Sequence, residues 1–371
     1  MRSWGVRTDT GEAAVFVKAN EPFEFQRYPL PEVEPGGILV RVKMASICGT
    51  DLHIFKGERE PPLPIILGHE AMGRVEVLGD EVETDTGGQP LREGDRVTWS
   101  YIWTDGTCHF CNILKEPASC LNRFTYGLGV ACDQPPHLTG GFAEYIYLQP
   151  RTSVFKVPDT LPDEVIAPVN CALVTMVHVT DKAQIRLNEN VVVQGSGPLG
   201  LFGMALAKEK GAGQVIALDT EDSRLAVADA FGVDETLNVG GLSDGEVVER
   251  IHELTDGIGA DVVIEATGVP QALPQGLKLP RDGGRYLTIG PIYVGAEAEF
   301  DLFNLIFRRI QVIGVARNDA RHLKDAIQFM DQTRARYPYE KVVGAKYALS
   351  DIEEAFRKVE SRTVMRTALV P

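Results

Sequence analysis

The chain has no excess of basic residues, and this absence limits the partners that it can bind. Among its 371 residues, 52 aspartates and glutamates outnumber 37 lysines and arginines, and the net charge is −15. Nucleic acids and anionic membrane surfaces are bound through basic patches. We therefore expect neither as a partner, and the acidity is typical of a protein that stays in solution through its charge.

The chain also has no long, uninterrupted apolar run. No apolar segment follows Met1, so the sequence predicts no signal peptide. Residues 190–207 are uncharged, but four glycines, a proline, Gln194 and Ser196 interrupt them. Six cysteines without a secretion signal indicate reduced thiols or metal ligands rather than a disulfide framework. We therefore expect a cytoplasmic protein without a membrane span.

The hydrophobic pattern of the first half predicts a β-rich domain. Apolar and polar residues alternate over residues 37–44, 74–78 and 94–99, as they do in half-buried strands. Clusters of glycine and proline separate these short strands. This arrangement is typical of a compact, barrel-like domain.

A different pattern begins near Asp163. Residues 191–193 form a continuous apolar run, as expected of a parallel strand buried on both faces. A predicted helix over residues 199–210 follows, and strands and helices then alternate as far as residue 315. The predicted strands include residues 214–219 and 286–290. This alternation predicts an α/β domain with a doubly wound parallel sheet. The end of the chain is expected to return to the first domain.

Cys48 and His69 are candidate metal ligands. Gly57, Gly68 and three prolines lie between them or beside them, so the chain can fold back and bring both side chains together. Soft sulfur combined with imidazole nitrogen indicates zinc rather than magnesium or calcium. Cys171 is the best third ligand, and Glu70 could bind directly or orient the site from behind.

Thr50 and His53 follow Cys48 closely and are candidates for a proton relay. A hydroxyl that is activated by zinc releases its proton, and this proton must reach solvent. A hydroxyl on the substrate side that passes the proton to an imidazole near the surface would do this. In the alternative interpretation, Thr50 caps a turn and His53 is simply exposed.

A glycine-rich turn predicts a dinucleotide site. Gly195-Ser-Gly197-Pro198-Leu199-Gly200 follows a predicted strand and opens a predicted helix, whose free N–H groups would face the pyrophosphate. Asp219 ends the next strand, nineteen residues after Gly200, where a carboxylate can accept hydrogen bonds from a ribose. Thr220 follows rather than arginine, which favours NAD over NADP. Arg224 could reach the adenosine end or could stabilise a solvated helix face.

Further short motifs occur along the whole chain. They are Cys48–His53, Gly68–Glu70, Glu93–Val97, Gly140–Tyr145, Gly195–Gly200, Glu265–Gly268 and Arg366–Thr367. Together they resemble the zinc-dependent medium-chain alcohol dehydrogenase family. The resemblance implies a GroES-like catalytic domain at residues 1–171 and 317–371. It also implies a Rossmann NAD-binding domain at residues 172–316.

The resemblance also implies roles for single residues. Catalytic zinc would be held by Cys48, His69 and Cys171, with Glu70 close by or exchanging with water. Thr175 would contact the nicotinamide, and the backbone near Ile289 would hold its carboxamide. Arg366 would contact the pyrophosphate. Members of this family usually form homodimers or homotetramers.

The chain departs from the family in a lobe that often holds a structural zinc on four cysteines. Cys108 and Cys111 fit that pattern, but Leu114 takes the third place and Cys120 comes two residues early. The fourth ligand could be His109 or Cys132, or the lobe could pack without metal. The short lobe is similar to that of a subgroup acting on cyclic secondary alcohols and cyclitols.

The sequence thus predicts NAD-dependent oxidation of an alcohol to a ketone or aldehyde, and the reverse reaction. The substrate is expected to be a secondary alcohol, cyclic or polyhydroxy. One alternative is a zinc-free quinone or enoyl reductase of the same fold, which does not need the four candidate ligands. The other is a protein that binds NAD without catalysis.

Overall fold

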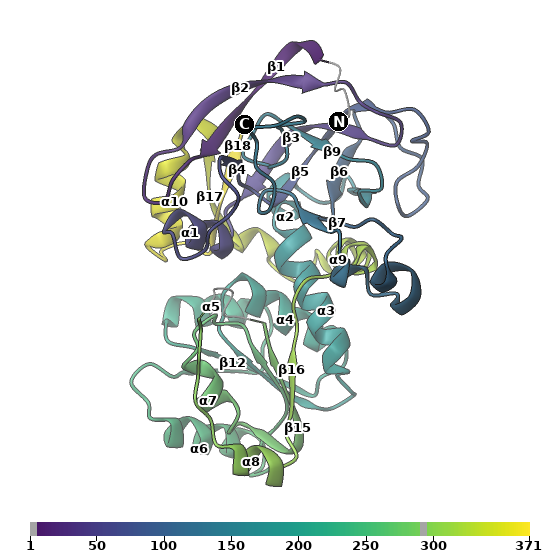
Figure 1. Ribbon diagram of the computed structural model, residues 1–371. Coiled ribbons are helices and arrows are strands. Elements are labelled where there is room, and N and C mark those ends of the chain that lie inside the picture. The colour runs from purple at the N-terminus through teal and green to yellow at the C-terminus, as the bar shows by residue number, and fades with distance from the viewer. Residues whose placement is uncertain (1–5, 290–294) are drawn as a thin grey trace. The chain divides into compact units, whose positions relative to one another are not determined.

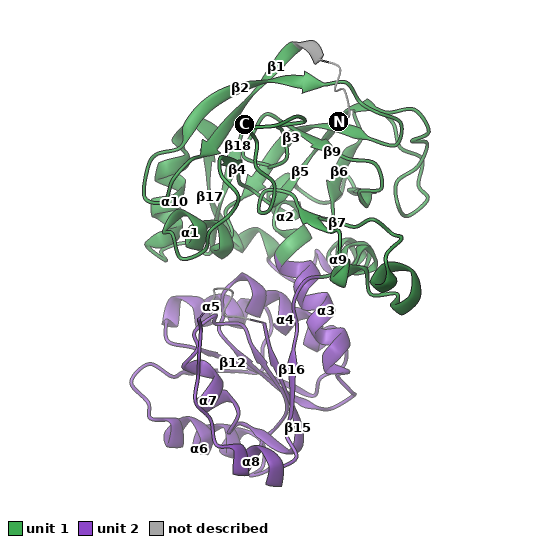
Figure 2. Ribbon diagram, viewed as in Figure 1, with its two compact units in different colours: residues 1–171, 318–332, 339–371 green, residues 172–317, 333–338 purple. Residues whose placement is uncertain are grey.

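The computed structural model describes residues 6–289 and 295–371. The chain divides into two compact units, shown in green and purple in Figure 2. Unit 1 comprises residues 1–171, 318–332 and 339–371, and unit 2 comprises residues 172–317 and 333–338. The short segment Thr333–Pro338 therefore groups with unit 2, whereas the sequence analysis kept residues 317–371 together.

The strands of unit 1 form mostly antiparallel sheets (Figure 1). A three-stranded sheet has the order β2 (Glu24–Pro31), β1 (Val6–Phe16), β4 (Ile65–Ile66). A seven-stranded sheet has the order β10 (Val154–Lys156), β6 (Arg96–Trp99), β5 (Glu70–Leu78), β3 (Ile38–Ser46), β18 (Arg366–Val370), β17 (Val343–Ala348), with β9 (Tyr145–Leu148) also paired to β3. The short strands β7 (Ile102–Trp103) and β8 (Phe124–Thr125) form a separate pair.

The last strand of the chain lies inside the sheet of unit 1. In β18, Ala368 pairs with Ser46 and Leu369 pairs with Ala45 of β3. This antiparallel register places Arg366, at the start of β18, beside the residues that follow β3. The C-terminal segment therefore contributes directly to the region around Cys48.

The helices of unit 1 range in length from 4 to 14 residues. They are α1 (Gly49–Phe55), α2 (Asp163–Ile166), α9 (Ala320–Thr333) and α10 (Ile352–Glu360). Phe356 of α10 packs in the core against Phe23, Phe55 and Phe142. Within residues 6–289 and 295–371, none of the helices combines the length and the apolar character needed to cross a membrane.

Unit 2 is a parallel sheet with helices on its connections. The six strands lie in the order β13 (Glu235–Asn238), β12 (Gln214–Asp219), β11 (Asn190–Gln194), β14 (Ala260–Glu265), β15 (Pro280–Thr288), β16 (Gln311–Gly314). The helices are α3 (Val174–Ala183), α4 (Pro198–Glu209), α5 (Asp222–Ala230), α6 (Asp244–Leu254), α7 (Ala272–Gly276) and α8 (Leu302–Phe307). All neighbouring strands run parallel, which confirms the predicted Rossmann-type sheet.

The strand order of unit 2 marks a ligand-binding edge. The chain moves outward from β11 to β12 and β13, and then returns to β14 on the other side of β11. In open sheets of this kind, ligands bind beyond the carboxyl ends of the strands at such a switch point. The glycine-rich turn follows β11 directly, so it lies at this edge.

Candidate zinc and dinucleotide sites

Four of the predicted site residues form one cluster in unit 1. The sulfurs of Cys48 and Cys171, a ring nitrogen of His69 and a carboxylate oxygen of Glu70 all lie within 4.8 Å of one another. Cys48 caps the N-terminus of α1, Glu70 opens β5, and Cys171 lies in a π-helical turn, Val169–Leu173. The exposed fractions of Cys48, His69 and Glu70 are 6%, 2% and 0%. Cys171 is half-buried, so the fold brings these residues together at a largely buried point.

Asp51 holds two members of this cluster in place, and the sequence analysis did not name it. Its Oδ2 accepts a hydrogen bond of 2.8 Å from the backbone N–H of Cys48. Its Oδ1 lies 3.4 Å from Nδ1 of His69. An acidic residue three positions after a helix N-cap is a known capping signal, and this signal could have identified Asp51.

Arg366 and Ser46 bind the carboxylate of Glu70. Arg366 Nη1 lies 2.8 Å from Oε2 of Glu70 and also donates to the carbonyl of Ile47 at 3.2 Å. The hydroxyl of Ser46 donates to the same Oε2. Burial raises the pKa of Glu70 to about 8, and the positive charge of Arg366 opposes this rise. The other oxygen, Oε1, has no hydrogen-bond partner within the described residues.

The two thiols of the cluster interact directly. A hydrogen bond from Cys171 holds the pKa of the Cys48 thiol well below its usual range, although burial works against this. The same hydrogen bond, together with burial, raises the pKa of Cys171. Two sulfurs, an imidazole and a carboxylate with one unpartnered buried oxygen match the donors that zinc prefers. The residues present therefore fit a zinc ion.

A second cluster lies in the lobe between β7 and β8. Ligand atoms of Asp105, Cys108, Cys111 and Cys120 lie within 4.8 Å of one another. The sulfur of Cys108 is 3.5 Å from that of Cys111 and 3.8 Å from that of Cys120. All six cysteines of the chain are free thiols. The three thiols of the lobe that the sequence predicted as candidate zinc ligands therefore lie close together.

The fourth member of this lobe cluster is Asp105. Its Oδ1 lies 3.4 Å from the sulfur of Cys120. Among the described residues, neither His109 nor Cys132 belongs to the group, and Cys132 instead lies 3.4 Å from the hydroxyl of Tyr28. Backbone N–H groups, first that of Thr107, lower the pKa of Asp105 and keep it charged. The lobe thus pairs three thiols with a carboxylate.

The glycine-rich turn in unit 2 has the geometry of a dinucleotide cradle. Gly195 has a φ of +94°, a left-handed conformation that favours glycine. Gly197 is the N-cap of α4, and Pro198 is its first residue, where proline is well tolerated. At Gly197 an added Cβ would meet nothing within 4 Å, so the backbone is open to a ligand there. Leu199 and Gly200 continue the first turn of the helix.

Asp219 stands beside this turn at the end of β12. Its carboxylate accepts hydrogen bonds from the backbone N–H groups of Ser196, at 2.7 Å, and of Thr220, at 2.8 Å. These bonds fix the carboxylate next to the glycine-rich turn. Arg224 lies on α5, which begins three residues after Asp219.

Comparisons with known proteins identify the family of the chain. Residues 34–159 match the alcohol dehydrogenase GroES-like domain family, and residues 198–332 match the zinc-binding dehydrogenase family. The chain is 31% identical to a 5-exo-hydroxycamphor dehydrogenase of Pseudomonas putida over 96% of this chain and 98% of the relative. It is 30% identical to an L-threonine 3-dehydrogenase of Anaeromyxobacter dehalogenans, with coverages of 94% and 96%. The crystal structure of an alcohol dehydrogenase from Thermotoga maritima superposes with a TM-score of 0.92 at 34% identity, covering 98% and 99% of the two chains.

The chain belongs to the zinc-containing medium-chain alcohol dehydrogenase family. It is an oxidoreductase that acts on CH–OH groups with NAD or NADP. The GroES-like domain predicted from the sequence is confirmed by the match at residues 34–159. The match at residues 198–332 covers most of the parallel-sheet unit and extends into residues 318–332 of unit 1.

In the dehydrogenase, the residues predicted for proton transfer lie on α1. Thr50 is 8% exposed, and its hydroxyl lies 3.8 Å from the sulfur of Cys48. His53 is three residues further along, so both side chains lie on one face of the helix. The Nδ1 atom of His53 is paired with the carboxylate of Glu58. The sequence analysis did not name Glu58.

Three further nucleotide contacts of the dehydrogenase stay predictions. Thr175 is 8% exposed and lies in the first turn of α3 in unit 2. Ile289 directly follows β15, and the neighbouring Gly290 lies outside the described residues. Arg366 was expected at the pyrophosphate, and its described partners are Glu70 and Ile47.

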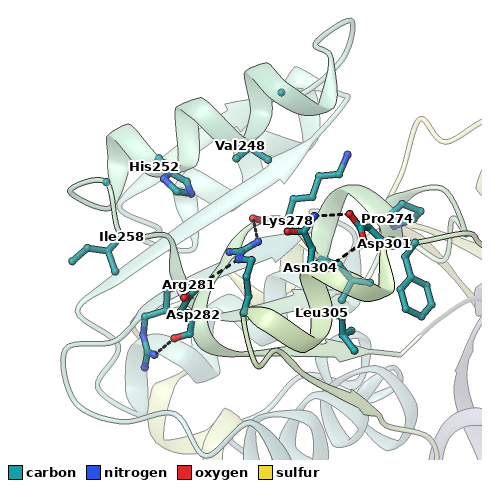
Figure 3. Close-up of a pocket in the computed structure, with 15 residues that line it drawn as sticks. Val248, His252, Ile258, Pro274, Lys278, Arg281, Asp282, Asp301, Asn304 and Leu305 are labelled. Atoms are coloured by element: carbon teal, nitrogen blue, oxygen red, sulfur yellow. Dashed lines mark hydrogen bonds and ion pairs between the residues drawn. The ribbon is translucent and has the colours of Figure 1, made fainter.

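A separate pocket of about 770 Å³ occurs in unit 2 of the dehydrogenase (Figure 3). Its apolar walls include Val248, Ile258 and Phe300. Its lysine and arginine side chains are paired with carboxylates: Lys278 with Asp244, Arg281 with Asp261, and Arg308 with Asp282. The lining residues Ile258 and Arg281 lie where β14 and β15 begin, whereas the glycine-rich turn follows the end of β11. This pocket is therefore not the dinucleotide site.

Proposed function

We propose that the protein is a zinc-dependent NAD dehydrogenase that converts a secondary alcohol into a ketone, and the reverse. The observation that carries this proposal is the buried cluster of Cys48, His69, Glu70 and Cys171. A zinc-free quinone or enoyl reductase would have no need for these four side chains at one point. The capping carboxylate of Asp51 also supports a metal site, because histidine ligands are commonly oriented by such a group.

The four residues of this cluster would hold the metal. Since Nδ1 of His69 faces Asp51, Nε2 is the nitrogen left for the metal. Arg366 and Ser46 restrain one oxygen of Glu70, so the second oxygen can bind or withdraw as substrate exchanges with water. Zinc held here would supply a Lewis acid that lowers the pKa of the substrate hydroxyl, as it does for bound water.

The chain's own residues would remove the proton. The hydroxyl of Thr50 lies next to Cys48 and can accept a proton from an alcohol that enters the site. The imidazole of His53, on the same face of α1, can receive this proton and release it to solvent.

The residues near the ribose support NAD rather than NADP. Asp219 is fixed at the end of β12 by three backbone N–H groups. Glu221 and Asp222 lie two and three residues after Asp219, so a 2′-phosphate would meet several negative charges. Like charges placed together across an interface cost several kcal/mol. The 2′-hydroxyl of NAD would instead donate to Asp219.

The relatives support a secondary alcohol as substrate. The first of them takes its name from a hydroxyl on a ring carbon of camphor, and the second from the 3-hydroxyl of threonine. Both hydroxyls are secondary. The short lobe also resembles that of dehydrogenases for cyclic secondary alcohols and cyclitols. We therefore propose a cyclic or polyhydroxy secondary alcohol.

A spectrophotometric screen tests this function. Linear primary, linear secondary, cyclic and polyhydroxy alcohols are supplied with NAD and with NADP, and NADH or NADPH formation is followed. We expect the highest kcat/KM with a secondary alcohol, and a preference for NAD of at least about a hundredfold, which corresponds to about 2.7 kcal/mol. In Asp219→Asn this preference should fall at least about tenfold, since one negative charge is lost. Turnover with NADP alone, or with none of the alcohols, would contradict the proposal.

We also propose that the lobe holds a second, structural zinc. Asp105 takes the place of the missing thiolate beside Cys108, Cys111 and Cys120. Asn122 donates to the remaining oxygen of Asp105 at 2.5 Å, as expected for a supported ligand. A closed site with four protein ligands is typical of structural zinc.

A face of unit 2 supports assembly of the protein into a homodimer or homotetramer. Strand β16 lies at the edge of the sheet, and Val312 on it is 44% exposed. The rings of Phe303 and Phe307 on α8 stack at 4.2 Å, and these residues are 63% and 64% exposed. An open strand edge beside an apolar patch is suited to pairing with a second copy about a two-fold axis.

Sedimentation analysis tests this assembly. We expect the wild-type protein to sediment as a dimer or tetramer, and Phe307→Asp to shift toward the monomer because it places a charge in the apolar face. Leu187→Asp is the matched control, because Leu187 is 79% exposed and lies away from α8 and β16 in the sequence. A monomeric wild-type protein, or equal dissociation of both variants, would refute this assembly face.

A further inference from the structure

Asn170 is a buried amide at the meeting point of the segments that carry the metal-cluster residues. It directly precedes Cys171 in the π-helical turn and is 1% exposed. Its Nδ2 atom donates to the backbone carbonyls of His69 at 3.2 Å, Ala71 at 3.4 Å and Trp99 at 3.2 Å. One side chain therefore joins the turn of Cys171 to β5 and β6.

The amide of Asn170 reaches these three carbonyls where the sheet opens, and the carbonyl of Ala71 also accepts from the hydroxyl of Thr98. The pairing of β5 with β6 ends at Met72 and Thr98. The carbonyls of His69 and Ala71 point to the same edge of their segment, since they are two residues apart in extended chain. The amide of Asn170 enters where the two strands separate. The opening lets His69 turn into the metal cluster while its backbone carbonyl remains hydrogen-bonded.

The orientation of the amide follows from its surroundings. Oδ1 of Asn170 has no hydrogen-bond partner within the described residues. A reversed amide would place this oxygen against three carbonyl oxygens, which is unfavourable. The N–H groups are therefore directed at the carbonyls of His69, Ala71 and Trp99. A donor of this shape and length is required, and neither aspartate nor alanine supplies one.

We propose that Asn170 is a positioning residue that sets the distance between Cys171 and His69 and thereby determines how tightly the catalytic metal is held. This inference depends on the proposed zinc site. Asn170 does not touch the substrate or the metal in this proposal. It acts through the backbone, because it fixes the turn of Cys171 against the segment that presents His69 and Glu70.

The test compares Asn170→Ala with Thr98→Val in the zinc-loaded protein. Thr98 is fully buried, and its hydroxyl donates to the carbonyl of Ala71 at 3.0 Å, which also accepts from Asn170. Thr98→Val therefore loses a buried hydrogen bond to the same acceptor but does not change the turn of Cys171. Release of zinc to a chromophoric chelator is followed by stopped flow, and the thiolate-to-cobalt absorption is recorded after replacement by cobalt. Cys111→Ser should lack zinc in the lobe. The zinc-release phase that remains in this variant therefore belongs to the cluster of Cys48 and Cys171.

We expect Asn170→Ala to release this metal at least about tenfold faster and to show an altered cobalt spectrum, in line with the effect of outer ligand partners. Thr98→Val should stay within about twofold of the wild type. If Asn170→Ala does not fold, Asn170→Ser, which retains a hydroxyl donor, should show a smaller acceleration. The inference would be wrong, without affecting the proposed function, if zinc release and the cobalt spectrum were unchanged in the Asn170 variant. The same conclusion would follow if Thr98→Val changed both quantities as much as the Asn170 variant does. A wild-type protein without metal at this cluster would refute the proposed function and this inference together.

Discussion

Cys48→Ser should remove one of two zinc ions from the protein and lower kcat/KM for the alcohol by at least about a thousandfold. A Lewis acid supplies several kcal/mol of transition-state stabilisation, and each loss of about 1.4 kcal/mol costs a factor of ten. Serine is a harder and less acidic ligand than cysteine, so zinc is held poorly. Metal content is measured by mass spectrometry and turnover by NADH formation.

Two controls make this result specific. NAD binding should stay within about twofold, because Cys48 lies in unit 1 whereas the glycine-rich turn and Asp219 lie in unit 2. Cys111→Ser should also retain one zinc ion, but it should keep turnover, since Cys111 belongs to the lobe cluster. If Cys48→Ser loses NAD binding in step with turnover, Cys48 maintains the fold instead. If it retains both zinc ions and full activity, the metal assignment is wrong.

Gly200→Ala and Gly197→Ala should separate the stability of the dinucleotide cradle from its affinity for NAD. A Cβ at Gly200 would lie 1.8 Å from the carbonyl oxygen of Gly195, and this backbone contact cannot be relieved by a side-chain movement. We expect Gly200→Ala to lower the free energy of unfolding by about 1–3 kcal/mol and to weaken NAD binding, because α4 must move away from β11.

Gly197→Ala should leave the free energy of unfolding unchanged within about 0.5 kcal/mol, because no atom lies within 4 Å of the added methyl group. The methyl group would instead occupy the space that the pyrophosphate needs, so the Kd for NAD should rise at least about tenfold. Denaturant unfolding and titration of NADH fluorescence measure the two quantities. Wild-type affinity in Gly197→Ala would show that the pyrophosphate binds elsewhere.

Patterns that are local in the sequence predicted much of the fold. Strand β12 was predicted at Gln214–Asp219 and occurs there, because an apolar run between polar ends specifies a buried strand. Helix α4 was predicted over residues 199–210 and begins one residue earlier, at Pro198. Strand β15 was expected from Tyr286 but begins at Pro280. Its first half contains Gly283 and Gly284, and glycines weaken the strand signal.

Contacts between distant segments were harder to predict. The pairing of β18 with β3 places Arg366 against Glu70, and no local pattern in the sequence indicates this register. Asp105 was missed for a similar reason. The fourth lobe ligand was expected to be a histidine or a cysteine, whereas the loop turns this aspartate toward Cys120.

The sequence by itself determined which kinds of donor atom the protein carries and the succession of strands and helices, because both are properties of neighbouring residues. Only the tertiary structure decided which donors meet. The metal cluster depends on sheet pairings between segments up to some 300 residues apart. These pairings bring together Cys48, His69, Glu70 and Cys171. They also place the supporting side chains of Asp51, Asn170 and Arg366 beside the cluster. Such pairings are set by the packing of the whole domain rather than by local propensity.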